Sequence, residues 1–179
     1  AETELGGLFS DIMKESIGLD VMLLGSGAVR NPEIGPIVLY SDLCECFPYD
    51  DPLYMLRVTG AQLKRMIKYM LRDEVWEGAH CEFYQFSTGV RVTYSKALHD
   101  FVQFNLNGEP IDDNKLYKIG LQHFHFLNVE NFFNIPLSEI EKNGKPRMVS
   151  TSCREILDEY LSVHPGLERS VSGRLIVED

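Results

Sequence analysis

The stretch "LYMLRVTGAQLKRMIKYML", residues 53–71, joins an expected strand to an expected helix. Leu53–Val58 has the apolar character of a strand. Thr59 and Gln62 then form a capping box, in which the Gln62 side chain reaches back from the third helical position. Apolar residues follow at three- and four-residue steps and supply the buried stripe of a helix, at Leu63, Met66, Ile67, Met70 and Leu71. This stretch therefore predicts a strand followed by a capped amphipathic helix.

Further strand and helix patterns lie on both sides of this stretch. The helical patterns are Leu5–Ile17, which Gly18 stops, a brief helix that Ser41 or Asp42 caps and that runs through Cys46, and a helix from the Ser152/Glu155 capping box through about Val163. The strand-like runs are Leu19–Leu24, Ile37–Tyr40, Phe83–Phe86, Gly89–Tyr94, Phe101–Leu106, Leu116–Gln122 and Arg174–Val177, with a turn at Asn107–Gly108.

The segment from His123 to about Val149 has no clear period, and we expect an irregular stretch there. No linker or repeat divides the chain. Helices alternate with clusters of strands elsewhere, so we expect one α/β (or α+β) domain over residues 1–179.

Composition limits the partners of the chain. It has 179 residues, 44% hydrophobic and 25% charged, as in an ordinary globular domain, and a net charge of -10. No basic cluster is present, so we expect no binding of DNA or RNA polymers. No apolar run is long enough for a membrane span, so we expect a soluble chain that binds no membrane. One or two arginines suffice for a small anionic ligand.

The turn "GSGAVR" at residues 25–30 carries two glycines with the spacing of a dinucleotide-binding fingerprint. That fingerprint needs a third glycine that opens a helix. Here Arg30 takes the place of this glycine, and a loop with two prolines follows. We therefore reject a Rossmann site. The residues alone favour a tight turn at a strand end, with an arginine on the rim.

Metal and nucleophile patterns are weak in this sequence. His123 and His125 form an HxH pair, but no acid or cysteine stands beside them at metal-ligand spacing, so a structural role is favoured over a metal site. No G-x-S-x-G elbow is present. The four cysteines favour reduced, partly buried thiols and a reducing compartment. Nothing in these patterns indicates a catalytic centre.

Aromatic residues gather in "CFPYDDPL" (residues 46–53) and "QHFHFLNVENFF" (residues 122–133). Most loop aromatics fill a core. Two of them could instead hold a planar ring between them, as in base stacking. The residues alone leave both interpretations open.

The order of these segments resembles the C-terminal domain of the 5'-nucleotidase family, which includes bacterial UDP-sugar hydrolases and 2',3'-cyclic-nucleotide phosphodiesterases. The resemblance covers essentially the whole chain and implies a layered α/β/β/α sandwich with mixed sheets. It rests on "ETELGGLFSDIMK", "DVMLLGSGAVR", "YSDLCECFPYDDPLYMLRVTGAQLKRMI", "VQFNLNGEPIDDNKLYKIG", "REILDEYLSVH" and "SGRLIVED", in this order.

The resemblance implies a division of labour. In the family, an N-terminal metallophosphatase domain holds two divalent metal ions and performs hydrolysis, and the C-terminal domain binds the substrate and carries it to the metals. This chain has none of the metal-binding motifs. The resemblance therefore implies a substrate-binding fragment without catalytic residues or cofactors of its own, whose partners are a nucleotide or nucleoside-type small molecule and an N-terminal metallophosphatase domain of the same chain.

The resemblance also implies the substrate-binding residues. Arg30 matches an arginine that contacts the substrate, and Gly25 stands where the family places a ligand-binding asparagine. Tyr49 and Phe124 match two phenylalanines that stack on the base. Glu130 falls on the acid that holds the ribose hydroxyl groups.

Departures from the family pattern keep other functions open. Asp50 and Asp51 follow Tyr49 and would repel a phosphate if they pointed into the site. One alternative is a binding or bracing module that has lost nucleotide recognition, and another is a hydrolase with a different leaving group, as in the related thiosulfohydrolases. The compartment stays open, because family members are often exported whereas the cysteines favour the cytoplasm.

Overall fold

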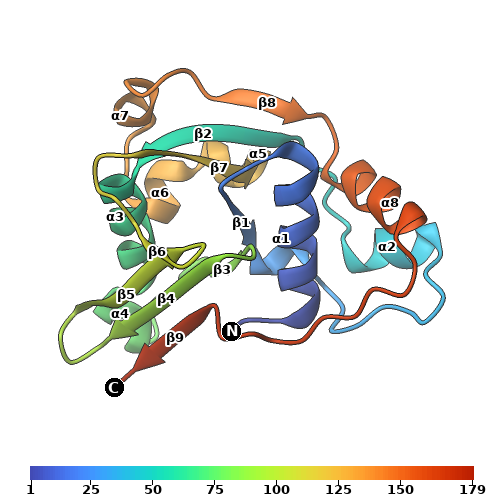
Figure 1. Cartoon of the computed structure of the whole chain (residues 1–179), viewed down its shortest axis with the longest axis horizontal. Helices are drawn as coiled ribbons and strands as arrows, with labels where there is room; N and C mark the ends of the chain where they lie inside the picture. Colours follow the sequence, from blue (N-terminus) through green and yellow to red (C-terminus); the bar gives the residue numbers. More distant parts are fainter.

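A five-stranded mixed sheet runs through the centre of the computed structural model, which describes residues 1–179 (Figure 1). Its strands lie in the order β3-β1-β7-β2-β8. The β1–β7 pair is parallel and the other pairs are antiparallel. The strands are β1 (Val21–Gly25), β2 (Leu53–Thr59), β3 (Tyr84–Phe86), β7 (Leu116–Gln122) and β8 (Arg147–Ser150).

A second, four-stranded sheet has the order β6-β5-β4-β9. It consists of β4 (Val90–Ser95), β5 (Asp100–Leu106), β6 (Glu109–Pro110) and β9 (Leu175–Glu178), and only the β4–β9 pair is parallel. The predicted turn at Asn107–Gly108 joins β5 to β6, and both of its residues have positive φ, of 53° and 85°.

Three helices cover one face of the five-stranded sheet (Figure 1). They are α1 (Glu4–Ile17), α2 (Tyr40–Cys46) and α8 (Cys153–Val163). Met22 and Leu24 of β1 point into the core between the sheet and these helices. Neighbouring residues of a strand point to opposite faces of the sheet, so the residues that alternate with Met22 and Leu24 point into a second core.

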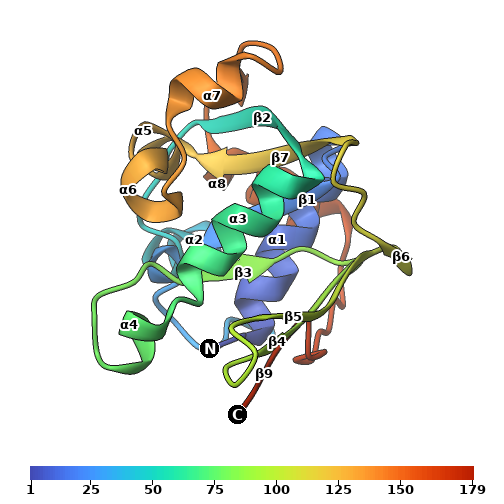
Figure 2. The same ribbon diagram turned by 90° about the vertical axis from the view of Figure 1, so that its left-hand side faces the viewer.

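That second core lies between the other face of the five-stranded sheet, the four-stranded sheet and two helices (Figure 2). Val21 and Leu23 of β1 point into it. The helices are α3 (Gly60–Met70) and α6 (Val129–Phe133), which contact each other. Because β1 is buried on both faces, its sequence is continuously apolar rather than alternating.

The remaining helices are short. They are η1 (Ser26–Ala28, a 3₁₀-helix), α4 (Asp73–Trp76), α5 (His123–Leu127) and α7 (Leu137–Glu141). The longest helix, α1, has 14 residues, and none of the helices combines the length and apolar character of a membrane span.

The fold class predicted from the sequence is confirmed, as an α/β arrangement with mixed sheets. The capping box of α3 is also confirmed. The Thr59 backbone N–H donates to Oε1 of Gln62 at 2.9 Å, and the Gln62 N–H donates to the Thr59 hydroxyl oxygen at 3.1 Å. Ser152 caps α8 by accepting from the Glu155 N–H at 2.9 Å, but the return bond from the Ser152 N–H to the Glu155 side chain is absent, so only half of the predicted capping box forms.

The predicted strand at Ile37–Tyr40 is wrong. Its side chains are exposed, no strand pairs with it, and Tyr40 begins α2. The Leu39 N–H donates to Oδ2 of Asp42 at 2.8 Å, so the helix begins before both of the caps expected at Ser41 and Asp42. β-branched residues favour a strand only where a partner edge is available.

The irregular stretch predicted from His123 to Val149 is also wrong. It contains α5, α6, α7 and β8. Each of the three helices has five residues, which is too short for a repeating apolar pattern. α6 and α7 form because Val129, Phe133 and Ile140 are buried in the second core, and the buried residue of α5 is His125.

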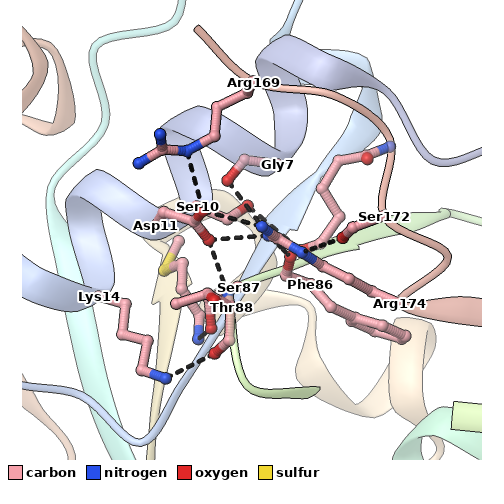
Figure 3. A network of polar contacts seen from close by, with 12 residues as sticks. Gly7, Ser10, Asp11, Lys14, Phe86, Ser87, Thr88, Arg169, Ser172 and Arg174 are labelled. Atoms are coloured by element: carbon pink, nitrogen blue, oxygen red, sulfur yellow. Dashed lines mark hydrogen bonds and ion pairs between the residues drawn. The ribbon is translucent and has the colours of Figure 1, made fainter. Parts of the chain in front are cut away.

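A buried ion pair joins the first helix to the segment that leads into the last strand (Figure 3). Asp11 and Arg174 are 7% and 8% exposed and bond through two N–H···O contacts of 2.7 and 2.8 Å. Arg174 also donates to the carbonyl of Phe86 at 2.6 Å, and Asp11 accepts from the Thr88 N–H at 2.6 Å. These bonds hold α1, the residues after β3 and the C-terminal segment together.

Candidate binding cleft

A cleft of about 360 Å³ opens at one edge of the five-stranded sheet. The parallel strands β1 and β7 both end at this edge, and ligands of α/β proteins commonly bind beyond the carboxyl ends of such strands. The residues that line the cleft follow β1, precede β2 and β3, or lie at the junction of β7 and α5. They are Gly27, Ala28, Arg30, Tyr49, Asp51, Glu82, Gln122, Phe124 and His125.

Arg30 and Tyr49 meet on the rim of the cleft. The Arg30 backbone N–H donates to the Cys46 carbonyl at 2.7 Å, which fixes the turn after η1 against the end of α2. The guanidinium group donates to the Tyr49 hydroxyl at 2.6 Å and lies 5.2 Å from the centre of the Tyr49 ring. The tyrosine thus orients the one positively charged side chain of the cleft.

Phe124 lies at the start of α5 and lines the same cleft. The residue is 55% exposed, and its ring centre lies 5.4 Å from that of His125 and 5.7 Å from that of Phe132. The Tyr49 side chain is 50% exposed. An exposed aromatic ring costs free energy in water unless a ligand covers it. The two rings therefore offer apolar surface to a planar ligand.

Gly25 ends β1 beneath the cleft, and His125 occupies the space beside it. A Cβ atom on Gly25 would collide with Nε2 and Cε1 of His125 and would lie 3.1 Å from Oε1 of Glu82. Nδ1 of His125 is 2.8 Å from the Tyr84 hydroxyl. Burial lowers the pKa of His125 to about 4, so the imidazole is neutral at pH 7.

The two aspartates after Tyr49 take different roles. Asp50 lies outside the cleft lining, where Oδ1 accepts from the Ser152 hydroxyl at 2.6 Å and from the Arg154 N–H at 3.1 Å. Asp51 lines the cleft, and its Oδ2 accepts from the Phe124 N–H at 3.3 Å. Only the second aspartate therefore adds negative charge to the cleft.

Glu82 and Gln122 were not predicted as site residues. Glu82 is half-buried, and burial raises the pKa of its carboxyl group, although a hydrogen bond from the Gly27 backbone and the nearby Arg30 charge lower it. Gln122 is 2% exposed. Both residues reach the cleft through strand pairing that no local motif encodes. One signal in the sequence marks Gln122, which is the last residue of a predicted strand and stands two residues before the candidate site residue Phe124.

Glu130 lies away from these residues. It is exposed on α6 and is not part of the cleft lining. The structure therefore brings Arg30, Tyr49 and Phe124 together over Gly25, whereas it leaves Glu130 outside.

A sequence profile described as "5'-nucleotidase, C-terminal domain" matches residues 1–135. The chain belongs to this family. Members of the 5'-nucleotidase family are phosphoric ester hydrolases.

The same family supplies the similar proteins. Protein UshA of Yersinia enterocolitica is 23% identical over 171 residues, which are 94% of this chain and 29% of UshA. A 5'-nucleotidase precursor from Thermus thermophilus superposes with a TM-score of 0.80 at 19% identity, over 99% of this chain and 36% of that chain. The NAD nucleotidase NadN of Haemophilus influenzae superposes with a TM-score of 0.79 at 17% identity, over 97% of this chain and 32% of NadN. The chain thus spans about a third of the length of these relatives.

Within this 5'-nucleotidase C-terminal domain, no three His, Cys, Asp or Glu side chains are placed to hold a metal ion. His123 and His125 of the HxH pair lie on a helix, α5, so their side chains point in different directions. His123 stacks on Tyr54 at 5.3 Å between ring centres, whereas His125 is buried against Tyr84. All four cysteines are free, and Cys46 and Cys153 are buried. The residues present do not form a metal centre.

A second hollow, of about 430 Å³, lies between α1, the loop before α2 and the end of α8. It is larger than the cleft but contains none of the five residues that the family resemblance assigns to the substrate. We therefore take the smaller cleft at the sheet edge as the candidate site.

Proposed function

We propose that residues 1–179 form a single substrate-binding domain of a two-domain, metal-dependent nucleotide phosphohydrolase. The observation that carries the proposal is the position of Tyr49 and Phe124. These half-exposed rings come from segments 75 residues apart, yet they line one cleft together with Arg30. Membership of the 5'-nucleotidase family supports nucleotides as the substrate class.

Each predicted residue has a defined part in this proposal. Tyr49 and Phe124 stack on the base, and each stacked ring contributes on the order of 1–3 kcal/mol. Arg30 attracts the phosphate or contacts the sugar. Gly25 leaves room for His125 beside the strand end. Glu130 accepts hydrogen bonds from ribose hydroxyl groups of a ligand that extends beyond the cleft towards α6.

The catalytic part of the reaction lies outside this chain in the proposal. Two divalent metal ions would be held by an N-terminal metallophosphatase domain of the same protein. We expect the purified chain to hydrolyse no nucleotide when divalent metal ions are added. Metal-dependent turnover by the pure chain would contradict the proposed division of labour.

A ligand titration tests the binding site directly. Adenosine and AMP are added to isotopically labelled chain, and amide shifts are followed by NMR. We expect ring-current shifts around Gly27 and Phe124 that are lost in both Tyr49→Ala and Phe124→Ala. Phe101→Ala, which removes a ring between β5 and the second core, serves as the control for loss of an aromatic side chain elsewhere.

A second candidate function is a binding or bracing module that no longer recognises nucleotides. It is favoured by the carboxylates of Asp51 and Glu82, which line the cleft with Arg30 as the only cationic side chain. The same titration separates the two candidates. Absence of shifts with both ligands at millimolar concentration supports the bracing module.

A further inference from the structure

Gln122 carries an unpaired polar atom at the cleft. It is the last residue of β7 and is 2% exposed. Its side-chain Oε1 is the one buried side-chain nitrogen or oxygen atom of the chain that has no hydrogen-bond partner. Native proteins pair such atoms, because a buried amide oxygen without a partner destabilises the folded state. An exception at the lining of a cleft points to a partner on the ligand.

Gln85 provides the contrast within the same sheet. It is 1% exposed on β3, yet its amide is fully used. Oε1 accepts from the Thr3 N–H at 2.9 Å, and Nε2 donates to the Ala1 carbonyl at 2.9 Å and to the Ser26 hydroxyl at 2.7 Å. Burial of a glutamine in this fold therefore does not by itself leave the amide oxygen unpaired.

The polar groups around Gln122 accept hydrogen bonds more than they donate them. Glu82 and Asp51 contribute carboxylates to the cleft, and Arg30 is its only cation. The Arg30 guanidinium group lies on the rim and donates to Tyr49. His125 is neutral at pH 7 and adds no positive charge. A phosphate is therefore suited to the rim, whereas the interior suits the donor-bearing edge of a ligand.

We propose that Gln122 is a specificity-determining residue whose side-chain oxygen accepts a hydrogen bond from an N–H or O–H donor of the ligand stacked between Tyr49 and Phe124. This inference rests on the proposed nucleotide-binding function. A nucleoside offers such donors from two sources, which are the exocyclic amino group of the base and the 2' and 3' hydroxyl groups of the sugar.

The test compares the chain with its Gln122→Met variant, which keeps the length of the side chain and removes its amide group, including the oxygen. Dissociation constants are measured by calorimetry for three ligands: adenosine, purine riboside, which lacks the amino group, and 2',3'-dideoxyadenosine, which lacks both hydroxyl groups. We expect Gln122→Met to weaken adenosine binding by about tenfold. If the donor is the amino group, purine riboside binds both proteins equally. If the donor is a hydroxyl group, 2',3'-dideoxyadenosine does so.

Thermal stability gives an independent readout. Removal of an unpaired buried oxygen removes a cost of folding, so Gln122→Met should melt at a higher temperature than the parent chain. The matched control Gln85→Met loses three hydrogen bonds and should melt at a lower temperature. A Gln122→Met variant that melts lower or fails to fold overturns the inference, because the amide group would then be stabilising the fold rather than kept for a ligand.

The outcomes separate this inference from the proposed function. If the parent chain binds neither AMP nor any of the three nucleosides, the nucleotide-binding function fails and the inference fails with it. If the parent chain binds them and Gln122→Met binds each of them equally well, only the role of Gln122 is overturned.

Discussion

The imidazole of His125 fills the space that a side chain on Gly25 would need. The family resemblance implies an asparagine at this position, whereas here a buried histidine from α5 occupies the space. The two positions are therefore coupled, because a larger residue at one requires a smaller residue at the other.

Gly25→Asn should destabilise the chain by about 1–3 kcal/mol, because the new side chain overpacks the contact with His125. Urea unfolding measures the loss. Gly27→Ala is the matched control, since its Cβ would meet only Oε1 of Glu82 at 3.7 Å, and it should change stability by less than about 0.5 kcal/mol. If Gly25→Asn in a His125→Ala background is as destabilising as in the parent chain, the coupling does not exist.

Loss of either partner of the Asp11–Arg174 pair should cost about 3–5 kcal/mol, because Asp11→Asn leaves the buried Arg174 charge without its carboxylate and Arg174→Met leaves Asp11 with only the longer ion pair to Arg169, of 3.7 Å. Chemical unfolding of Asp11→Asn and Arg174→Met measures this cost. Lys64→Met breaks the exposed pair with Asp113 and should cost less than about 1 kcal/mol. Equal effects of the buried and exposed variants would show that burial does not govern the strength of the pair.

His125 should make the stability of the chain fall between pH 6.5 and 4. Its pKa is about 4 in the folded chain and 6.5 as a model value, so the unfolded chain takes up the proton first as the pH decreases. The contribution of the neutral His125 to the free energy of unfolding is fully present above pH 6.5, and up to about 3 kcal/mol of it is lost by pH 4.

Urea titrations of the parent chain and His125→Gln between pH 7.5 and 4 isolate this effect. The raised pKa of Glu82 acts in the opposite direction in both proteins and cancels in the comparison. Parallel pH profiles of the two proteins would contradict a neutral, buried His125.

Arg30→Met should weaken AMP binding by about tenfold and leave adenosine binding within about twofold, because a charged hydrogen bond to the phosphate is lost. Calorimetry with the two ligands measures the ratio. Arg91→Met is the matched control, because it removes the same charge from β4, away from the cleft. If the ratio of the dissociation constants for AMP and adenosine is the same in Arg30→Met as in the parent chain, Arg30 does not bind the phosphate.

Local patterns were sufficient to predict much of the fold. The Thr59–Gln62 capping box and the strand Leu53–Val58 depend on residues close in sequence, and the sequence alone predicts both. The strand expected at Ile37–Tyr40 failed because pairing, and not propensity, decides a strand. Three five-residue helices between His123 and Glu141 escaped prediction because tertiary packing stabilises them.

The candidate site was only partly accessible from the sequence. Arg30, Tyr49 and Phe124 were found through the family resemblance, and the structure places them around one cleft. Glu82 and Gln122 reach that cleft through the β3-β1-β7 order of the sheet, which joins segments distant in sequence. A side chain without a local motif gives no signal until the strand order is known.

The bond between Asp11 and Arg174 also sets an order of events during protein synthesis. Asp11 belongs to the first helix, but its charge partner is made 163 residues later. Until Arg174 has been made, Asp11 lacks its partner at 2.7 Å, and β4 lacks its parallel neighbour β9. The packing of α1 and β4 is therefore complete only when residues 174–178 are present, and a segment that stops before them lacks both the charge partner of Asp11 and the outer strand of the four-stranded sheet.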